Sequence, residues 1–238
     1  MSDPNLAGSA DALINKDDGR NYWNSVNADV DAMLGGIPSV EGFSCVSRVD
    51  LQGSRSFLAK LGIGRTNGRR KVVNALEGGA GIGRVTEGLL LDVADHVDVI
   101  EPVAKFAIAL QAKAGVRNTF NLGLEEWQPE DGAQYDLIWT QWCVGYLTDK
   151  ELVRYLQRCK EALNPSAGVI VIKENLSTSG CDLFDDTDSS VTRGDDKFRS
   201  LFEQAGLRVV RTETQRGFPI SLPRKLFPVR MYALKPKT

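Results

Sequence analysis

The residues with the clearest chemical potential form a glycine-rich turn, Glu77-Gly-Gly-Ala-Gly-Ile-Gly-Arg84, that directly follows the apolar run Val72–Leu76. A tight turn between a strand and a helix needs glycines, because they adopt positive φ and let a ligand approach the main chain. About twenty residues further on, the next apolar run ends at Glu101, whose carboxylate can accept both hydroxyls of a ribose. A glycine turn also occurs without any ligand, but together with Glu101 it predicts a site for a nucleoside.

Two nucleoside cofactors, NAD and S-adenosylmethionine, could bind at such a turn, and the spacing favours the second. Dinucleotides such as NAD require the spacing G-x-G-x-x-G, in which the last glycine lets the helix pack closely on the strand. Counted from Gly79, that last position is Arg84, a bulky cation. S-adenosylmethionine has no pyrophosphate but carries a carboxylate that Arg84 can pair with and a cationic end that Glu77 can face. We therefore expect Gly79, Gly81, Arg84 and Glu101 to bind S-adenosylmethionine.

The elements that position this turn alternate between short valine- and isoleucine-rich runs and helical patterns. Strands are predicted at Val72–Leu76, Val97–Ile100, Thr119–Leu122, Tyr135–Trp139, Val169–Ile172, Leu207–Glu213 and Val229–Leu234, and helices at Arg84–Val93, Val103–Lys113, Asp149–Leu163 and Asp195–Ala205. Such alternation predicts a parallel sheet covered on both faces. The last two strands follow one another without a helix, so we predict an antiparallel last strand. The expected fold class is α/β: a doubly wound, seven-stranded Rossmann-like sheet of the S-adenosylmethionine methyltransferase type.

The N-terminal part has a different pattern. Residues 1–20 are small and polar, and we expect a flexible tail there. Apolar residues then recur at three- and four-residue steps over Asn21–Gly36, and a second helix is expected at Leu51–Leu61. We expect residues 21–65 to form a helical extension that covers the cofactor as a lid, with residues 71–238 as the core, all in a single domain.

Composition narrows the partners and the compartment. The net charge is −2, which does not favour nucleic acid as a partner, and no apolar run approaches the roughly 18 residues of a membrane span. The N-terminus lacks the apolar stretch of a signal peptide. The cysteines, Cys45, Cys143, Cys159 and Cys181, are scattered, so we expect reduced thiols and no metal site. These features favour a monomer in the cytoplasm or the nucleus.

Several stretches together resemble one family, the α-N-terminal protein methyltransferases, from about residue 21 to residue 235. The matching residues include Tyr22-Trp23, Gly79-Ala-Gly-Ile-Gly-Arg84, Gln141-Trp142, Gly145-Tyr-Leu-Thr-Asp149 and Asp185-Asp-Thr-Asp-Ser-Ser-Val191. The Gln-Trp and Asp-x-Asp-Ser-Ser elements are not general methyltransferase features, which makes the resemblance specific. It implies methylation of the α-amino group of proteins that begin X-Pro-Lys, with ribosomal proteins as the expected type of substrate.

The resemblance also implies roles for individual residues. Those implied for the cofactor are Gly79, Arg84, Glu101, Leu124 and Gln141, to which we add Gly81 and, as part of the lid, Trp23. Those implied for the peptide are Trp23, Leu34, Trp142, Asn175, Asp185 and Ser190, with Asp188 beside the reacting amine. Tryptophans more often belong to a core than to a binding surface, but Trp142 lies just past a strand end, where α/β sheets bind ligands.

These roles are chemically reasonable for methyl transfer to an amine. The amine must be neutral, and an α-amino group has a pKa of about 8, so removing its proton is a modest demand. Asp188 can accept the proton, and Asn175 can hold the amine through its amide oxygen. An acidic run such as Cys181–Asp188 is usually a solvated loop. Here it follows a strand's carboxyl end and is long for a connection, so we expect Asp185 to bind the lysine of the substrate.

One position departs from the family. Many members have a histidine, proposed as a second base, where this chain has Tyr146, and its one histidine is His96, just before a predicted strand. Because tyrosine has a pKa of about 10, it is a poor base at neutral pH. We expect Asp188 or water to take the proton and Tyr146 to orient the peptide.

Three other functions remain open on the sequence alone. The first is a small-molecule N- or O-methyltransferase with the same cofactor site. The second is a non-catalytic binding subunit with this fold, against which the presence of both Asn175 and Asp188 argues. The third is a NAD-dependent oxidoreductase.

Overall fold

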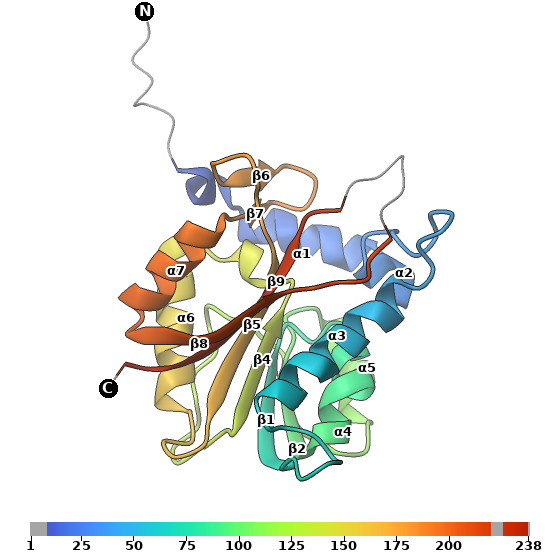
Figure 1. The fold of residues 1–238 in the computed structure, drawn as a ribbon. Helices are drawn as coiled ribbons and strands as arrows, with labels where there is room; N and C mark the ends of the chain where they lie inside the picture. Colours follow the sequence, from blue (N-terminus) through green and yellow to red (C-terminus); the bar gives the residue numbers. More distant parts are fainter. Residues whose placement is uncertain (1–8, 220–225, 238) are drawn as a thin grey trace, which may run out of the picture.

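The computed structural model describes residues 9–219 and 226–237 (Figure 1). At its centre lies a seven-stranded sheet with the order β3-β2-β1-β4-β5-β9-β8. Its strands are β1 (Val72–Gly78), β2 (Ala94–Ile100), β3 (Val116–Phe120), β4 (Leu137–Gln141), β5 (Val169–Asn175), β8 (Leu207–Thr214) and β9 (Val229–Pro236). The predicted seven-stranded α/β sheet is confirmed.

The direction of the strands fixes where a ligand can bind. Strand β1 pairs in parallel with β2 on one side and with β4 on the other, so the chain order reverses at β1. Parallel sheets bind ligands at such a switch point, outside the carboxyl ends of the strands. At the far side β9 runs antiparallel to both β5 and β8, as expected for the last strand.

Helices cover both faces of the sheet (Figure 1). One face is covered by α3 (Val46–Lys60), the π-helical turn η2 (Thr86–Leu90), α4 (Leu91–Val93) and α5 (Ala104–Gln111), and the other by α6 (Asp149–Glu161) and α7 (Asp195–Gln204). Each face has its own apolar core, built around Trp139 on the first and Tyr155 on the second. Strands that are buried on both faces explain the nearly continuous apolar runs of the sequence.

The N-terminal segment differs from the prediction. The prediction of a flexible tail up to residue 20 is wrong from residue 10 on: a 3-10 turn, η1 (Ala10–Leu13), leads into α1 (Lys16–Ser25), while residues 1–8 lie outside the described ranges. Polar contacts hold this segment, since the Asn15 side chain caps α1 and its backbone N–H donates to Ser189 Oγ at 2.8 Å. A polar segment without apolar periodicity therefore folds because the core offers it hydrogen-bond partners.

The single helix predicted over Asn21–Gly36 is also wrong, because the chain breaks after α1 and forms a second, short helix, α2 (Val30–Met33). Asp29 begins α2 by accepting a hydrogen bond from Ala32 N. Asp and Asn side chains that bond to the backbone favour such helix starts. The apolar periodicity of the two helices together resembles one longer helix.

The acidic segment expected to be a loop is a β-hairpin of β6 (Leu183–Asp185) and β7 (Ser190–Thr192). It lies beside α1 above the carboxyl ends of the parallel strands (Figure 1). Between β4 and α6, a 3-10 turn, η3 (Val144–Tyr146), carries the position where the family has histidine. The hairpin, η3 and α1 thus meet at the edge of the sheet where ligands bind.

Candidate active site

A cavity opens at the carboxyl ends of β1, β2 and β4, beneath α1, and holds about 1080 Å³ of empty space including its mouth. Its walls include all seven residues for which the sequence predicts a cofactor role: Trp23, Gly79, Gly81, Arg84, Glu101, Leu124 and Gln141. Trp142 and Tyr146 line it as well. Residues separated by more than a hundred positions in the sequence therefore face one space.

The glycine turn needs its glycines for two reasons. Gly79 and Gly81 have φ values of +70° and +56°, a region that other residues rarely adopt. A Cβ atom at Gly79 would lie 2.5 Å from Cys143 Sγ, and one at Gly81 would lie 2.8 Å from Met33 Sδ. The turn is packed against the cavity wall, so any side chain there would displace its neighbours.

Two buried carboxyl groups face this space. Glu101, at the end of β2, accepts hydrogen bonds from Gly81 N at 2.7 Å and from Val103 N at 2.8 Å. Burial raises its pKa to about 7 despite these two donors. Glu77, at the end of β1, accepts from the Thr86 hydroxyl, and burial raises its pKa to about 8. Neither carboxyl group forms an ion pair within the part of the chain that the structure describes, so a cationic or hydroxyl-bearing ligand would stabilise their ionised forms.

Arg84 and Gln141 are held from behind by a residue that the sequence analysis did not single out. Arg84 Nη1 lies 2.9 Å from Asp50 Oδ2, and the guanidinium sits 5.4 Å from the centre of the Trp142 ring. Gln141 Nε2 donates to both oxygens of Asp50, and its Oε1 accepts from Trp139 Nε1. The expected pairing of Arg84 with a cofactor carboxylate would thus add to an ion pair within the protein.

Trp142 has an unusual backbone. Its φ is +54°, and its indole N–H is buried without a hydrogen-bond partner among the described residues. The strained turn is fixed from β5, because Trp142 N donates to Lys173 O and the N–H groups of Cys143 and Val144 donate to Glu174 Oε1. Such strain persists where the surroundings enforce it, commonly at functional sites, and here it aims the indole at the cavity.

Tyr146 connects the cavity to the acidic hairpin. Its hydroxyl donates to Asp188 Oδ2 at 2.6 Å, while Asp188 Oδ1 is buried without a partner among the described residues. Trp23 contacts the Tyr146 ring edge to face, with centroids 6.3 Å apart. A Cβ at Gly19 would come within 3.3 Å of both Tyr146 and Asp188 O, so α1 packs closely over this pair.

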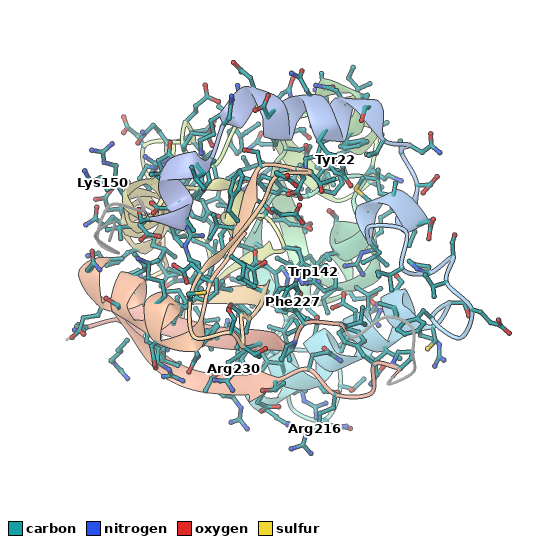
Figure 2. All side chains as sticks on the ribbon, turned by 90° about the horizontal axis from the view of Figure 1, so that it is seen from above. Tyr22, Trp142, Lys150, Arg216, Phe227 and Arg230 are labelled. Carbon is teal, nitrogen blue, oxygen red and sulfur yellow. The ribbon has the colours of Figure 1, made fainter. Side chains whose placement is uncertain are left out.

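The remaining residues predicted to contact the peptide, and Asp188, are not among the residues that line the cavity. Leu34 is buried just after α2, Asn175 ends β5, and Asp185 and Ser190 pair across the hairpin. Burial and the nearby carboxylates of Asp188 and Asp185 raise the pKa of Tyr22 on α1. Seen from above, Tyr22 lies on α1 and Trp142 near the middle of the molecule (Figure 2).

Sequence reasoning missed two parts of the site. Asp50 and Lys173 form a fully buried ion pair behind the cavity, and Asn15 and Lys16 of the supposed tail line the cavity itself. The burial of Asp50 could have been recognised from the sequence, because Asp50 lies at helical spacing between Val46 and Ser54 on the buried face of α3. Within the described ranges, no group of three or more His, Cys, Asp or Glu side chains could hold a metal, and no helix could cross a membrane.

Known proteins resemble this chain over nearly its whole length. A family described as AdoMet dependent proline di-methyltransferase matches residues 11–235. An alpha N-terminal protein methyltransferase 1 of Schizosaccharomyces pombe is 45% identical over 221 residues, which cover 92% of this chain and 95% of the relative. An N-terminal Xaa-Pro-Lys N-methyltransferase 1-A of Xenopus laevis is 42% identical over 207 residues, 84% of this chain and 88% of the relative. The crystal structure of a SAM-dependent methyltransferase of Leishmania major, 36% identical, superposes with a TM-score of 0.80 and covers 97% of this chain and 87% of its own.

The sheet order, the glycine turn at the switch point and the buried carboxyl groups beside it define a methyltransferase that uses S-adenosylmethionine. This confirms the predicted enzyme class and cofactor and excludes the NAD alternative. The chain belongs to the AdoMet-dependent proline di-methyltransferase family.

Proposed function

We propose that this enzyme methylates the α-amino group of proteins that begin Xaa-Pro-Lys. The observation that carries the proposal is the carboxylate of Asp188, which accepts a hydrogen bond from Tyr146 of the cavity wall and has its Oδ1 buried and unpartnered among the described residues. A buried acceptor without a donor is costly, and a substrate ammonium would supply the donor. The relatives named for this reaction are 42–45% identical to the chain.

The cavity fits the cofactor. Glu101 has one lone pair on each oxygen left for ribose hydroxyls beyond its two backbone donors. Arg84 would hold the methionyl carboxylate and Glu77 the methionyl ammonium, while Gly79 and Gly81 allow close approach and Leu124 and Trp23 form apolar walls. Gln141 would contact the cofactor with its side-chain amide, which Asp50 and Trp139 hold in one orientation. When bound, the cofactor supplies an electrophilic methyl group next to a positively charged sulfur.

The protein's own task is to present a neutral amine. Asp188 would bind the ammonium form, accept its proton and leave the lone pair pointing toward the cofactor cavity. Asn175 at the end of β5 would fix the amine through its side-chain oxygen. Tyr146 cannot share the proton transfer, because burial and the neighbouring Asp188 carboxylate raise its pKa well above the ordinary value. Its role is to orient Asp188.

The residues that follow the amine would be recognised by shape and charge. A prolyl residue has no backbone N–H to satisfy and packs flat on an indole, which suits Trp142, and Leu34 and Ser190 are proposed as further peptide contacts. The following lysine would be drawn to Asp185 on the acidic hairpin. Such rim charges contribute mainly to the recognition and capture of the substrate.

The test is incubation of the enzyme with labelled S-adenosylmethionine and an Ala-Pro-Lys or Ser-Pro-Lys peptide, followed by mass spectrometry. We expect mass gains on the peptide's amino terminus. The matched control is the same peptide acetylated at its α-amino group, which should gain nothing. Turnover of a metabolite without any gain on the free peptide would instead support a small-molecule N- or O-methyltransferase, and binding without turnover of either would support a non-catalytic subunit.

The cellular setting is part of the proposal. All four cysteines are free thiols, which supports a reducing compartment such as the cytoplasm or the nucleus. Within it, ribosomal proteins with a processed Xaa-Pro-Lys terminus are the proposed substrates, and a monomer is the proposed active form. Nucleic acid and membrane have no part in this scheme.

A further inference from the structure

Behind the cofactor cavity lies a buried polar cluster, which joins the N-terminal extension to the sheet. It consists of Asp50 and Ser54 on α3, Arg84 after the glycine turn, Gln141 on β4, Lys173 on β5 and Gln215 after β8. Asp50, Ser54 and Lys173 are fully buried. Two of its members, Arg84 and Gln141, also line the cofactor cavity.

Asp50 is the centre of this cluster. Its carboxylate lies 2.5 Å from Lys173 Nζ and 2.9 Å from Arg84 Nη1, and it accepts from Gln141 Nε2 at 3.0 and 3.1 Å. Two of these three partners, Arg84 and Gln141, line the cofactor cavity, whereas Asp50 and Lys173 do not. Asp50 therefore touches both cavity-lining side chains from the protein side.

The charges of the cluster do not balance. It holds two basic side chains, Lys173 and Arg84, against the single carboxylate of Asp50, and burial lowers the pKa of Lys173. Lys173 directs its three N–H donors within the protein, to Asp50 O, Ser54 Oγ and Gln215 Oε1. Arg84 is satisfied less completely, because its Nη1 is buried without a hydrogen-bond partner among the described residues, and its side chain, 9% exposed, faces the cavity. An uncompensated buried cation favours an anion in the adjacent space.

We propose that Asp50 is a positioning residue for the cofactor: it holds Arg84 and Gln141 in place, so that the Arg84 guanidinium meets the methionyl carboxylate. The proposal rests on the proposed role of Arg84. The Asp50 carboxylate also pairs with Lys173 and so connects helix α3 to β5. One residue therefore holds both the N-terminal extension and the side chain that would bind the cofactor's carboxylate. Because Asp50 is the ion-pair partner that fixes the Arg84 guanidinium, losing Asp50 weakens the site even though Asp50 does not touch the ligand.

The experiment compares two ligands by calorimetry. S-adenosylhomocysteine carries the amino-acid carboxylate, and 5′-methylthioadenosine has the same nucleoside and thioether without it. In Asp50→Asn, we expect affinity for S-adenosylhomocysteine to fall by about tenfold or more and affinity for 5′-methylthioadenosine to change by less than about twofold. The matched control is Asp98→Asn, which removes another buried carboxylate, paired with Arg117 outside the cavity lining, and should change neither affinity.

A second variant separates positioning from simple charge neutralisation. Asp50→Asn leaves Lys173 without its counter-charge and can impair folding, whereas the double variant Asp50→Asn/Lys173→Met removes the whole ion pair. We expect the double variant to fold, by thermal unfolding, and to keep the selective loss for S-adenosylhomocysteine. Recovery of wild-type affinity in the double variant, or equal weakening of both ligands, would overturn the proposal. Failure of the wild-type enzyme to methylate the peptide would count against the proposed function and not against this inference.

Discussion

The hydroxyl of Tyr146 donates a hydrogen bond of 2.6 Å to Oδ2 of Asp188, which joins the turn after β4 to the acidic hairpin. Burial and the carboxylate raise the pKa of Tyr146 well above its ordinary value, so the hydroxyl remains a protonated donor at neutral pH. It occupies one oxygen of Asp188 and leaves the other free of partners among the described residues. Under the proposed function, the pair would supply one proton acceptor and one orienting group, without a second base.

Replacing the two residues should separate these roles. Asp188→Asn removes the proton acceptor and should lower kcat by about 10²- to 10⁴-fold. Tyr146→Phe keeps the acceptor and loses only its orientation, so we expect a loss of less than about tenfold. Single-turnover rates at saturating peptide measure both effects. Equal losses in the two variants would contradict this division of labour and make Tyr146 a partner in proton transfer.

Glu77 should make cofactor binding depend on pH. Burial raises the pKa of Glu77 to about 8, so much of it is neutral at pH 7. A ligand ammonium favours the ionised form, and binding should therefore release protons. Affinity for S-adenosylhomocysteine should rise as the pH increases from about 6 to about 8. Calorimetry in buffers of different ionisation enthalpy measures the proton release, and Glu77→Gln should abolish the Glu77 part of it.

Glu77 should also make the stability of the ligand-free enzyme depend on pH, but in the opposite direction: a higher pH should lower the stability. Because the pKa of Glu77 is raised in the folded state from an ordinary value of 4.5, folding favours its protonated form. Its contribution is fully present below about pH 4.5 and is lost as the pH rises through about 8. We expect Tm of the ligand-free enzyme to fall over this window, and to fall less in Glu77→Gln. A Tm that is equally dependent on pH in both proteins would place the effect in other carboxyl groups, such as Glu101 and Glu174.

The sheet and the cofactor side of the site could be predicted because they depend on local patterns. Apolar runs determine strands, and a glycine turn such as 79–83 must follow β1 for steric reasons. Their spacing places Arg84 and Glu101 at one edge of the sheet, whatever the details of packing. These features require no knowledge of contacts between segments distant in the chain.

The parts that could not be predicted depend on such distant contacts. Nothing near Asn15 indicates that its N–H will meet Ser189, and nothing near Asp50 indicates that Lys173 will neutralise it. Polar contacts of this kind leave no periodic signal, because each depends on a single pair of residues brought together by the fold. The segment of residues 10–20 was assigned to a tail for this reason.

Arg193 should be essential for the geometry of the acceptor side. It is fully buried and donates to Val144 O at 3.1 Å and Leu147 O at 2.5 Å, and it forms an ion pair with Asp149. These contacts hold η3, the turn that carries Tyr146, against the end of β7, the strand that follows Asp188. Arg193→Met should cost about 3–5 kcal/mol and lower Tm by roughly 10 °C. It should also raise KM for the peptide while affinity for S-adenosylhomocysteine stays near that of the wild type.

The matched control for this variant is Arg211→Met, which breaks the ion pair with Glu213 on the surface of β8. Such exposed pairs contribute about 0–1 kcal/mol, so Tm and KM should hardly change. Differential scanning calorimetry and steady-state kinetics on both variants provide the comparison. An Arg193→Met enzyme with wild-type KM would show that the turn keeps its shape without this clamp.

Asp185 should determine the preference for lysine at the third position of the peptide. Its carboxylate is exposed at the end of β6, and its field, together with that of Asp188, reaches Tyr22 on α1. An exposed ion pair with the substrate is worth about 1 kcal/mol, so Asp185→Asn should raise KM for an Ala-Pro-Lys peptide by roughly fivefold. KM for an Ala-Pro-Gln peptide should not change, and kcat should remain the same for both.

Asp186→Asn is the control, because it removes the same charge from the adjacent position of the hairpin. If lysine binds at Asp185, the control should raise KM for the lysine peptide by less than about twofold. The difference between the two variants should also shrink at high salt, because exposed charges are screened. Equal increases of KM in both variants would mean that the lysine is attracted by the summed field of the hairpin, and that no single carboxylate selects it.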